Sequence, residues 1–359
     1  MSNMRSDVIK HGVDAAPARS LLRADGLKDE DFDKPFIGIA DSWNEVVPGH
    51  IHLNKIVDAV KEGIREAGGV PFVFGTPAVC DGIAMGHKGM RYSLISREVI
   101  SDCCEVMVEG HAMDGWVGVS NCDKVTPGML MAAGRMNIPA LMVTGGAMEA
   151  GKLNGEDIDF QSVFEAIGQV QVGAADESFL KTVECAACPG AGSCSGLFTA
   201  NTMACLTETL GMSLTGCGTS LAVDEKKLAI AKESGKRIVE LVKKGIKPRD
   251  IVNSHSFHNA ICVDMAIGGS TNTALHIPAI SKEFGCPVDL SEFDKISREV
   301  PHITSLRPAG QFHIRDLDNA GGVPAILKRL IDHIEDAPTV NGKSVMEIAQ
   351  FYTDAFFAD

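Results

Sequence analysis

The fold of this 359-residue chain is decided around one stretch, Trp116-Val117-Gly118-Val119-Ser120-Asn121-Cys122-Asp123-Lys124-Val125-Thr126-Pro127-Gly128. Its apolar start, 116–119, is typical of a buried strand, and the residues after Pro127 are typical of a helix. Proline is well tolerated in the first turn of a helix, because the N–H groups there have no intrahelical acceptor. A thiol, a carboxylate and an amine are therefore predicted at the carboxyl end of a strand, where open α/β sheets bind ligands.

Three such side chains on a strand-to-helix turn can surround one small site, and their chemistry suggests a metal centre. Cys122 offers a thiolate for iron or zinc, and Asp123 offers an oxygen for magnesium or manganese. Lys124 does not fit that picture, because a protonated amine repels a metal ion. The alternative is a buried cysteine followed by a solvated Asp–Lys pair in a loop.

The same alternation of strand and helix recurs along the chain and predicts the fold class. Apolar runs at 35–42, 70–77 and 139–146 predict further strands, and helices are predicted at 21–31, 51–64, 97–112, 159–180 and 223–244. This pattern favours a three-layer α/β/α fold with a largely parallel sheet. We expect one α/β domain over residues 1–340, with 341–359 starting a linker or a following domain.

A second thiol–carboxylate pair follows the strand predicted at 70–77, where Cys80 precedes Asp81. This pair resembles Cys122-Asp123 in both chemistry and position. Because the carboxyl ends of parallel strands meet at one edge of a sheet, both pairs are expected on that edge.

A third cysteine-rich segment reads Cys185-Ala186-Ala187-Cys188-Pro189-Gly190-Ala191-Gly192-Ser193-Cys194-Ser195-Gly196. Glycines let a backbone wrap an iron–sulfur cluster and direct N–H groups at its sulfurs. The spacing matches no ferredoxin pattern and includes no fourth cysteine, so a cluster here would take a ligand from elsewhere, such as Cys122. A structural zinc or simply buried thiols remain open on spacing alone.

The composition of the chain limits the classes of partner and the cellular compartment that these motifs can belong to. The chain is 45% hydrophobic and 22% charged, with a formal net charge of -14, which argues against a nucleic-acid partner. No apolar run has the length of a membrane span, and the first residues lack the apolar segment of a signal peptide. Eleven cysteines in such a chain favour free thiols over disulfides. We expect a cytoplasmic protein without a membrane partner.

Five ordered motifs resemble the dihydroxy-acid and phosphogluconate dehydratase family. They are Pro48-Gly49-His50, the run 80–90 that starts Cys80-Asp81-Gly82, Asn121-Cys122-Asp123-Lys124, the run 192–201 around Cys194, and Gly268-Gly269-Ser270-Thr271-Asn272. The form of 193–201 is similar to the dihydroxy-acid branch rather than the sugar-acid branch. The resemblance covers the chain from its start to about Gly322.

The resemblance implies two metal cofactors. An iron–sulfur cluster, [2Fe-2S] or [4Fe-4S], would be held by Cys122 and Cys194. Magnesium would be held by Asp81, Asp123 and Lys124, with the lysine carbamylated and therefore an anionic oxygen ligand. Relatives with a clear third cluster cysteine carry it where this chain has Gly49, so the third ligand stays open between Cys188 and Cys80.

The resemblance also implies an activity and a partner domain. The expected reaction is dehydration of 2,3-dihydroxy-3-methylbutanoate, and of 2,3-dihydroxy-3-methylpentanoate, to the 2-oxo acid in branched-chain amino-acid biosynthesis. Family members continue into a β-rich carboxyl-terminal domain that supplies a further magnesium carboxylate and the proton-accepting serine. We therefore expect this chain to be the amino-terminal part of a homodimeric enzyme, inactive alone, with no catalytic base of its own.

Two other functions stay open at this point. A sugar-acid dehydratase acting on phosphogluconate would need a basic clamp for the phosphate, for which Lys88, Arg91 and Arg97 are weak candidates. A non-catalytic cluster-binding domain would need only thiols, so the presence of Asp81 and Lys124 argues against it. Gly268 to Asn272 could present amides to a substrate carboxylate or could serve helix packing.

Overall fold

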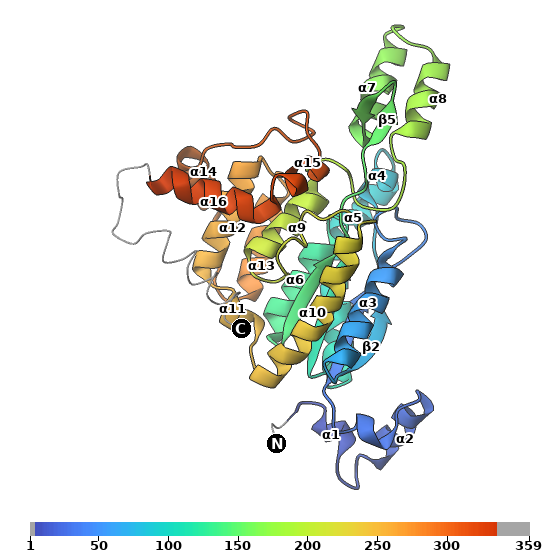
Figure 1. The fold of residues 1–359 in the computed structure, drawn as a ribbon, viewed down its shortest axis with the longest axis vertical. Coiled ribbons are helices and arrows are strands. Elements are labelled where there is room, and N and C mark those ends of the chain that lie inside the picture. The colour runs from blue at the N-terminus through green and yellow to red at the C-terminus, as the bar shows by residue number, and fades with distance from the viewer. Residues whose placement is uncertain (1–3, 336–359) are drawn as a thin grey trace.

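A four-stranded parallel sheet forms the centre of the molecule (Figure 1). This computed structural model of the chain describes residues 4–335, so the domain boundary predicted at residue 340 lies outside the described residues. The strands lie in the order β2-β1-β3-β4, and they span Phe36–Asp41 (β1), Val70–Gly75 (β2), Gly115–Ser120 (β3) and Ala140–Thr144 (β4). Within residues 4–335, no helix has the length and apolarity needed to cross a bilayer.

The two faces of the sheet bury different side chains, because successive residues of a strand point to opposite sides. One face packs against α3 (Leu53–Glu66) and α10 (Glu225–Lys244) and carries Ile37, Ile39, Val117, Val119, Leu141 and Val143. The other face packs against α5 (Arg91–Gly110) and α6 (Val125–Met136) and carries Phe36, Ala40, Trp116 and Met142. This three-layer arrangement confirms the predicted α/β/α fold class.

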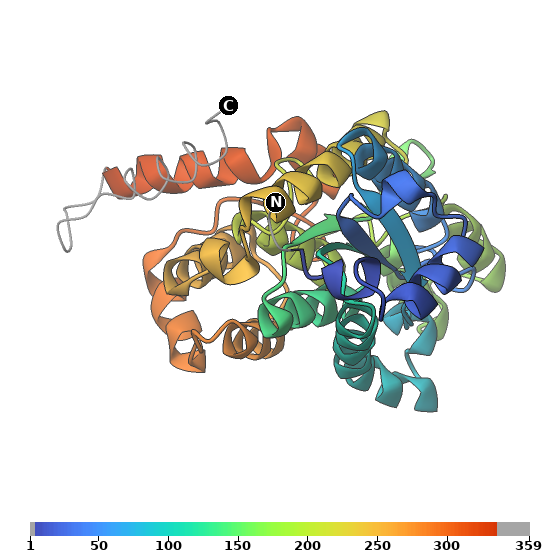
Figure 2. The ribbon, with the colours of Figure 1, turned by 90° about the horizontal axis from the view of Figure 1, so that it is seen from below.

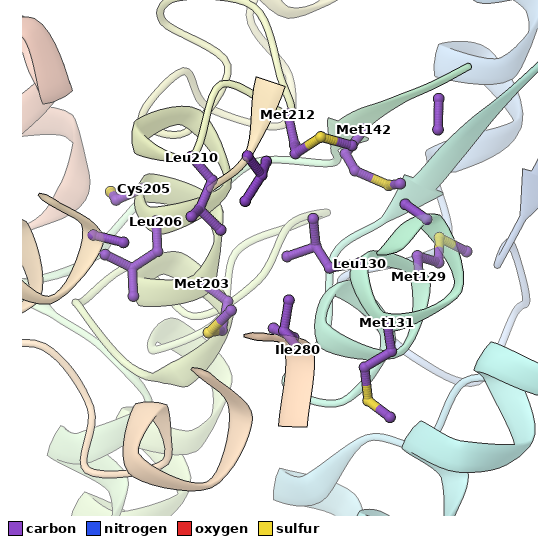
Figure 3. Close-up of a cluster of buried hydrophobic side chains, with 14 of the residues drawn as sticks. Met129, Leu130, Met131, Met142, Met203, Cys205, Leu206, Leu210, Met212 and Ile280 are labelled. Carbon is purple, nitrogen blue, oxygen red and sulfur yellow. The ribbon is translucent and has the colours of Figure 1, made fainter. Parts of the chain in front are cut away.

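A block of helices lies outside α6 and buries a second layer of core. Figure 3 shows Leu130 of α6 (Val125–Met136) pointing toward Ile280 of α13 (Thr273–Glu283) and toward Met203 of α9 (Thr199–Thr209), whereas Met129 and Met131 point to other sides of α6. Flexible methionine side chains suit the irregular gaps between these helices. The block is completed by α11 (Pro248–Ile251), α12 (Ser254–Ile267), α14 (Leu290–Glu299), α15 (Ile314–Asn319) and α16 (Gly322–Glu335).

The remaining elements lie at the two ends of the strands. The short helices α1 (Asp7–Lys10) and α2 (Ala16–Ala24) lie at one end, in front of the sheet in Figure 2. At the other end, α4 (Asp81–Ala84) and the 3₁₀ helix η2 (Lys88–Met90) follow β2, and α7 (Phe160–Gln171) and α8 (Glu177–Ala186) project beyond them (Figure 1).

The structure confirms the four predicted strands, corrects two predicted helices and adds one hairpin. The helix expected at 21–31 is wrong: α2 ends at Ala24, and a 3₁₀ turn, η1 (Asp29–Asp31), follows. The helix expected at 159–180 is two helices, because the chain turns at Gly173, whose φ is +73°. A small hairpin, β5 (Gly151–Leu153) and β6 (Glu156–Ile158), was not predicted, although Asn154-Gly155 is a strong hairpin signal.

The strand order places a switch point between β1 and β3. From β1 the chain goes to β2 on one side, and then returns to place β3 on the other side of β1. In open α/β sheets, such a point opens a crevice at the carboxyl ends of the strands. The loops that leave β1 and β3 here contain Gly49 and Cys122, respectively.

Candidate metal centre at the carboxyl edge of the sheet

Asn121 ties together three loops at the switch point. Its side-chain amide donates hydrogen bonds to the carbonyl oxygens of Gly49 (2.9 Å) and Gly146 (2.8 Å), and the residue is buried. Gly145 donates its backbone N–H to Ser120 O at 2.7 Å, which closes the same junction. The loops after β1, β3 and β4 are therefore held in fixed positions around Cys122.

The loop that carries Cys194 is fixed to this junction by its neighbours. Gly192 donates its N–H to Pro48 O, and Ser193 donates its N–H to Gly146 O, at 3.1 and 3.0 Å. Asn201, on α9, donates its side-chain amide to the carbonyl oxygens of Cys194 and Gly196. This buried asparagine belongs to the 192–201 motif, and its role is to shape the cysteine loop.

Gly49 lies directly against the Cys122 thiol. A Cβ atom at residue 49 would stand 3.4 Å from Cys122 Sγ and 3.5 Å from Gly192 O. A side chain at this position would therefore begin in contact with the Cys122 thiol.

Three half-buried thiols, Cys80, Cys122 and Cys194, are electrostatic neighbours at this edge. Burial raises the pKa of the Cys122 thiol well above its usual range, and four acidic neighbours raise it further: Asp123, Cys80, Cys194 and Asp81. Burial likewise raises the pKa of Cys194, with Asp123, Cys80 and Cys188 adding to the effect. Thiolates at these positions therefore require a compensating positive charge, such as bound iron.

Cys80 and Cys188 occupy different surroundings. Cys80 precedes α4 and acts electrostatically on both Cys122 and Cys194. Cys188 is an exposed residue in the loop after α8. Partial burial of its sulfur atom raises the pKa of the thiol, and the nearby charges of Asp159 and Cys80 raise it further. Cys80 is thus the better placed of the two candidates for a third thiolate. Cys185 is exposed on α8.

The second group of predicted residues surrounds the Lys124 amine. Lys124 Nζ lies 2.6 Å from Asp81 Oδ2 and 3.9 Å from Asp123 Oδ2, and only 8% of the lysine side chain is exposed. Ser93, on α5, donates its hydroxyl to Asp81 Oδ1 at 2.5 Å. Burial raises the pKa of Asp123 to about 6, and the neighbouring charge of Asp81 adds to the shift. The two carboxylates therefore repel each other across the lysine.

The glycine-rich loop 268–272 borders the same lysine. Asn272 Oδ1 lies 3.5 Å from Lys124 Nζ. The loop is fastened to α9 by Ser270, whose N–H donates to Thr202 Oγ1 (3.1 Å) and whose hydroxyl meets Thr199 Oγ1 (2.8 Å). Asp264, on α12, also fixes the conformation of the loop, because its carboxylate accepts a hydrogen bond from the Thr273 hydroxyl at 2.6 Å. The loop is therefore packed against α9, and it also places the side chain of Asn272 beside Lys124.

His276 is a site residue that the motifs did not indicate. It lies on α13, is fully buried, and receives a hydrogen bond at Nδ1 from Arg97 Nη1 of α5 at 3.3 Å. Burial lowers its pKa to about 3, and the charges of Arg97 and Lys124 lower it further. Helical spacing could have revealed it, because residues four apart on a helix share a face and Asn272 belongs to the recognised motif.

The predicted ligands meet the needs of a metal site only in part. Within residues 4–335, no three His, Cys, Asp or Glu side chains converge closely enough to hold a single metal ion. Two observations nevertheless fit the implied groups: Cys122 and Cys194, whose pKa values are raised, have each other and Cys80 as neighbours, and the Asp81 and Asp123 carboxylates lie near each other. In the unmodified state, the Lys124 amine occupies the position between those carboxylates.

Comparisons with known proteins support this assignment of the motifs. Residues 34–348 match the family described as "Dihydroxy-acid/6-phosphogluconate dehydratase N-terminal". A protein of Methanosarcina barkeri named dihydroxy-acid dehydratase is 57% identical over 345 residues, or 96% of this chain and 62% of that protein. Proteins of the same name from Methanoregula boonei and Methanococcus aeolicus are 55% and 56% identical, over 98% and 96% of this chain and 64% and 63% of theirs.

The matches cover most of this chain but only part of each relative. The family match covers most of the chain and includes all five motifs, whereas the chain spans 62–64% of the length of these three relatives. The chain belongs to the dihydroxy-acid/6-phosphogluconate dehydratase family, and it matches the amino-terminal domain of that family.

Proposed function

We propose that this chain forms the cluster- and magnesium-binding part of a dihydroxy-acid dehydratase, a hydro-lyase that removes water from 2,3-dihydroxy-3-methylbutanoate and its 3-methylpentanoate homologue. The observation that carries the proposal is the gathering of Cys80, Cys122 and Cys194 next to the Asp81–Lys124–Asp123 group. A thiol-ligated cluster alone would not require the second group. The names of the three relatives support the dihydroxy acid over the sugar acid as substrate.

Cys122 and Cys194, with Cys80 as the third thiolate, are the residues we assign to an iron–sulfur cluster. Asp81, Asp123 and carbamylated Lys124 are assigned to magnesium. When bound, these groups supply Lewis acidity, which helps a hydroxyl leave and acidifies a neighbouring C–H bond. The chain's own contribution is to fix the two ligand sets side by side through the Asn121 junction and to orient Asp81 through Ser93.

The position of Lys124 favours a carbamate over a free amine. Lys124 is the residue that precedes the first turn of the twelve-residue helix α6. The amino terminus of a helix carries partial positive charge and favours anions, so a buried ammonium is unfavourable there. Carboxylation joins the neutral Nζ to CO₂, forming one N–C bond and releasing one proton. The product is an anion whose oxygens bind magnesium well.

The proposal is tested by an anaerobic assay of 2-oxo acid formation. The chain, reconstituted with iron, sulfide and magnesium, is assayed together with the carboxyl-terminal part of a relative so that the full length of the relatives is represented. We expect turnover of 2,3-dihydroxy-3-methylbutanoate in preference to 6-phosphogluconate, with loss of turnover in Asp81→Asn. A preference for 6-phosphogluconate would favour the sugar-acid alternative. Iron uptake without turnover of either acid would favour a cluster-binding domain.

The dimer and the carboxyl-terminal domain with its proton acceptor remain predictions. Neither bears on the assignment of the ligands within this chain. Sedimentation of the purified protein tests the predicted dimer.

A further inference from the structure

The face of α13 that looks toward Lys124 carries two polar residues one turn apart. Asn272, at the start of the helix, places Oδ1 3.5 Å from Lys124 Nζ, and His276 follows four residues later on the same face. α13 packs along α6, which Lys124 precedes. The Lys124 charge acts on the His276 ring. The histidine therefore belongs to the wall of the Lys124 site.

The hydrogen bonding of His276 selects one tautomer. Arg97 has only donors, so its Nη1, 3.3 Å away, requires Nδ1 of the neutral ring to be the acceptor. The ring proton must then reside on Nε2. Arg97 is held in place by a second bond, from Nη1 to Leu275 O at 3.2 Å, and by its ion pair with Glu98. The Nε2–H direction is thus fixed by its neighbours on α5 and α13.

The Nε2–H group has no partner. It is fully buried, and it makes no hydrogen bond to any of the described residues. A buried donor without an acceptor costs about 1–3 kcal/mol, so such groups are rare and call for an explanation. An ammonium at Lys124 offers no acceptor, whereas a carbamate at the same nitrogen would offer two oxygens.

We propose that His276 is a positioning residue whose Nε2–H, fixed by Arg97, donates a hydrogen bond to the carbamate of Lys124. This role rests on the proposed function, because it requires the carbamate. The hydrogen bond stabilises the carbamate against loss of CO₂ and turns its oxygens toward Asp81 and Asp123. Asn272, one turn before His276, lies 3.5 Å from the same nitrogen and adds a second polar group beside it.

The test compares two variants of His276 by a readout that does not depend on turnover. His276→Leu removes the donor at similar size, and His276→Gln keeps an N–H donor. The 359-residue chain is equilibrated with ¹³C-bicarbonate, with and without magnesium, and the carbamate is measured by ¹³C NMR. Removing a hydrogen bond to a charged group should weaken bicarbonate incorporation by roughly 10- to 100-fold in His276→Leu, with substantial recovery in His276→Gln.

Controls separate this role from folding and from the carbamate itself. His258→Leu alters an exposed histidine on α12 and should leave incorporation unchanged. Circular dichroism confirms that each variant is folded. Incorporation in His276→Leu equal to that of the wild type overturns the role of His276, and so does equal loss in both His276 variants. Absence of any carbamate signal from the wild-type chain overturns the proposal that Lys124 is carbamylated, and with it the proposed role of His276.

Discussion

At the scale of single residues, the candidate centre depends on thiols that differ in their neighbours rather than in their chemistry. Cys80, Cys122 and Cys194 act on one another electrostatically, whereas Cys205 is buried on α9 among apolar side chains and contacts Gly218 O at 3.9 Å. Burial raises the pKa of Cys122 and of Cys194, and it raises the pKa of Cys205 as well. Burial alone therefore does not distinguish the candidate ligands from Cys205; the grouping of the thiols does.

This grouping predicts which cysteines hold a cluster. After anaerobic reconstitution, Cys122→Ser, Cys194→Ser and Cys80→Ser should each lose most of the visible absorbance and bound iron, because each removes one thiolate of the group. Cys205→Ser and the exposed Cys188→Ser should retain both. Equal loss in all five would mean that folding rather than ligation is measured. Retention in Cys80→Ser with loss in Cys188→Ser would reverse the choice of third ligand.

Lys124 supports a second prediction at this scale. Lys124→Arg keeps the positive charge but cannot form the carbamate, so magnesium affinity should fall at least tenfold while the cluster absorbance remains. Calorimetric titration with magnesium, in the presence and absence of bicarbonate, measures the effect. The matched control is Lys227→Arg, at a fully buried lysine that binds the carbonyl oxygens of Thr144 and Cys217. Bicarbonate-independent magnesium binding to the wild type would contradict the assignment.

At the scale of elements, the sequence predicted what depends on local pattern and missed what depends on contact between distant segments. Three strands, β1, β3 and β4, are apolar runs buried almost throughout, and the edge strand β2 is an apolar run that is only partly buried, so their pattern was sufficient. Cys122, Asp123 and Asp81 were found because each follows a strand. His276 was missed because its role comes from α5 and α6, which lie elsewhere in the sequence. Strand order, and hence the switch point, also required the structure.

The contact between α3 and α10 depends on one glycine in each helix. A Cβ atom at Gly235 would stand 2.2 Å from Val60 O, and one at Gly63 would stand 1.9 Å from Lys232 O. The helix backbones therefore touch, and glycine is required on both sides. Because α3 and α10 together cover one face of the sheet, this crossing fixes that layer.

Gly235→Ala should therefore destabilise the protein even though alanine favours helices. Propensity alone would stabilise α10 by roughly 0.5–1 kcal/mol. Separating two packed backbones costs more, on the order of 1–3 kcal/mol or above, so the net change should be destabilising. Urea unfolding measures it. Gly245→Ala is unsuitable as a control because its φ is +68°, whereas Gly168→Ala, on α7 with nothing within 4 Å of the added Cβ, should be neutral or stabilising.

At the scale of the whole molecule, the site is assembled from loops that the sheet brings to one edge, so its integrity depends on global folding. The Asn121 junction joins the loops after β1, β3 and β4, and the 192–201 segment completes it. His50 lies in the first of these loops. It is fully buried, with Nδ1 2.7 Å from Ser42 O, and burial lowers its pKa to about 4. Its protonation is thereby linked to unfolding of the entire domain.

This linkage predicts that the protein loses stability as the pH falls from about 6.5 to about 4. In that window the unfolded chain protonates this histidine, while the folded protein keeps it neutral, so the unfolded state binds more protons and is favoured by acid. A shift from 6.5 to about 4 corresponds to a loss of up to about 3 kcal/mol by the lower end of the window. His52, whose pKa is lowered mainly by burial, adds to the loss. Urea unfolding at pH 7.5, 6 and 5 should show it.

His50→Asn isolates the contribution of one ring to this acid sensitivity. Asparagine keeps an N–H donor for Ser42 O but does not titrate, so the variant should lose less stability between pH 7.5 and 5 than the wild type, whatever its stability at pH 7.5. The exposed His255→Asn should leave the pH dependence unchanged, because an exposed histidine is solvated in both states. If His50→Asn retained the full wild-type dependence, acid unfolding would have to originate at other buried groups.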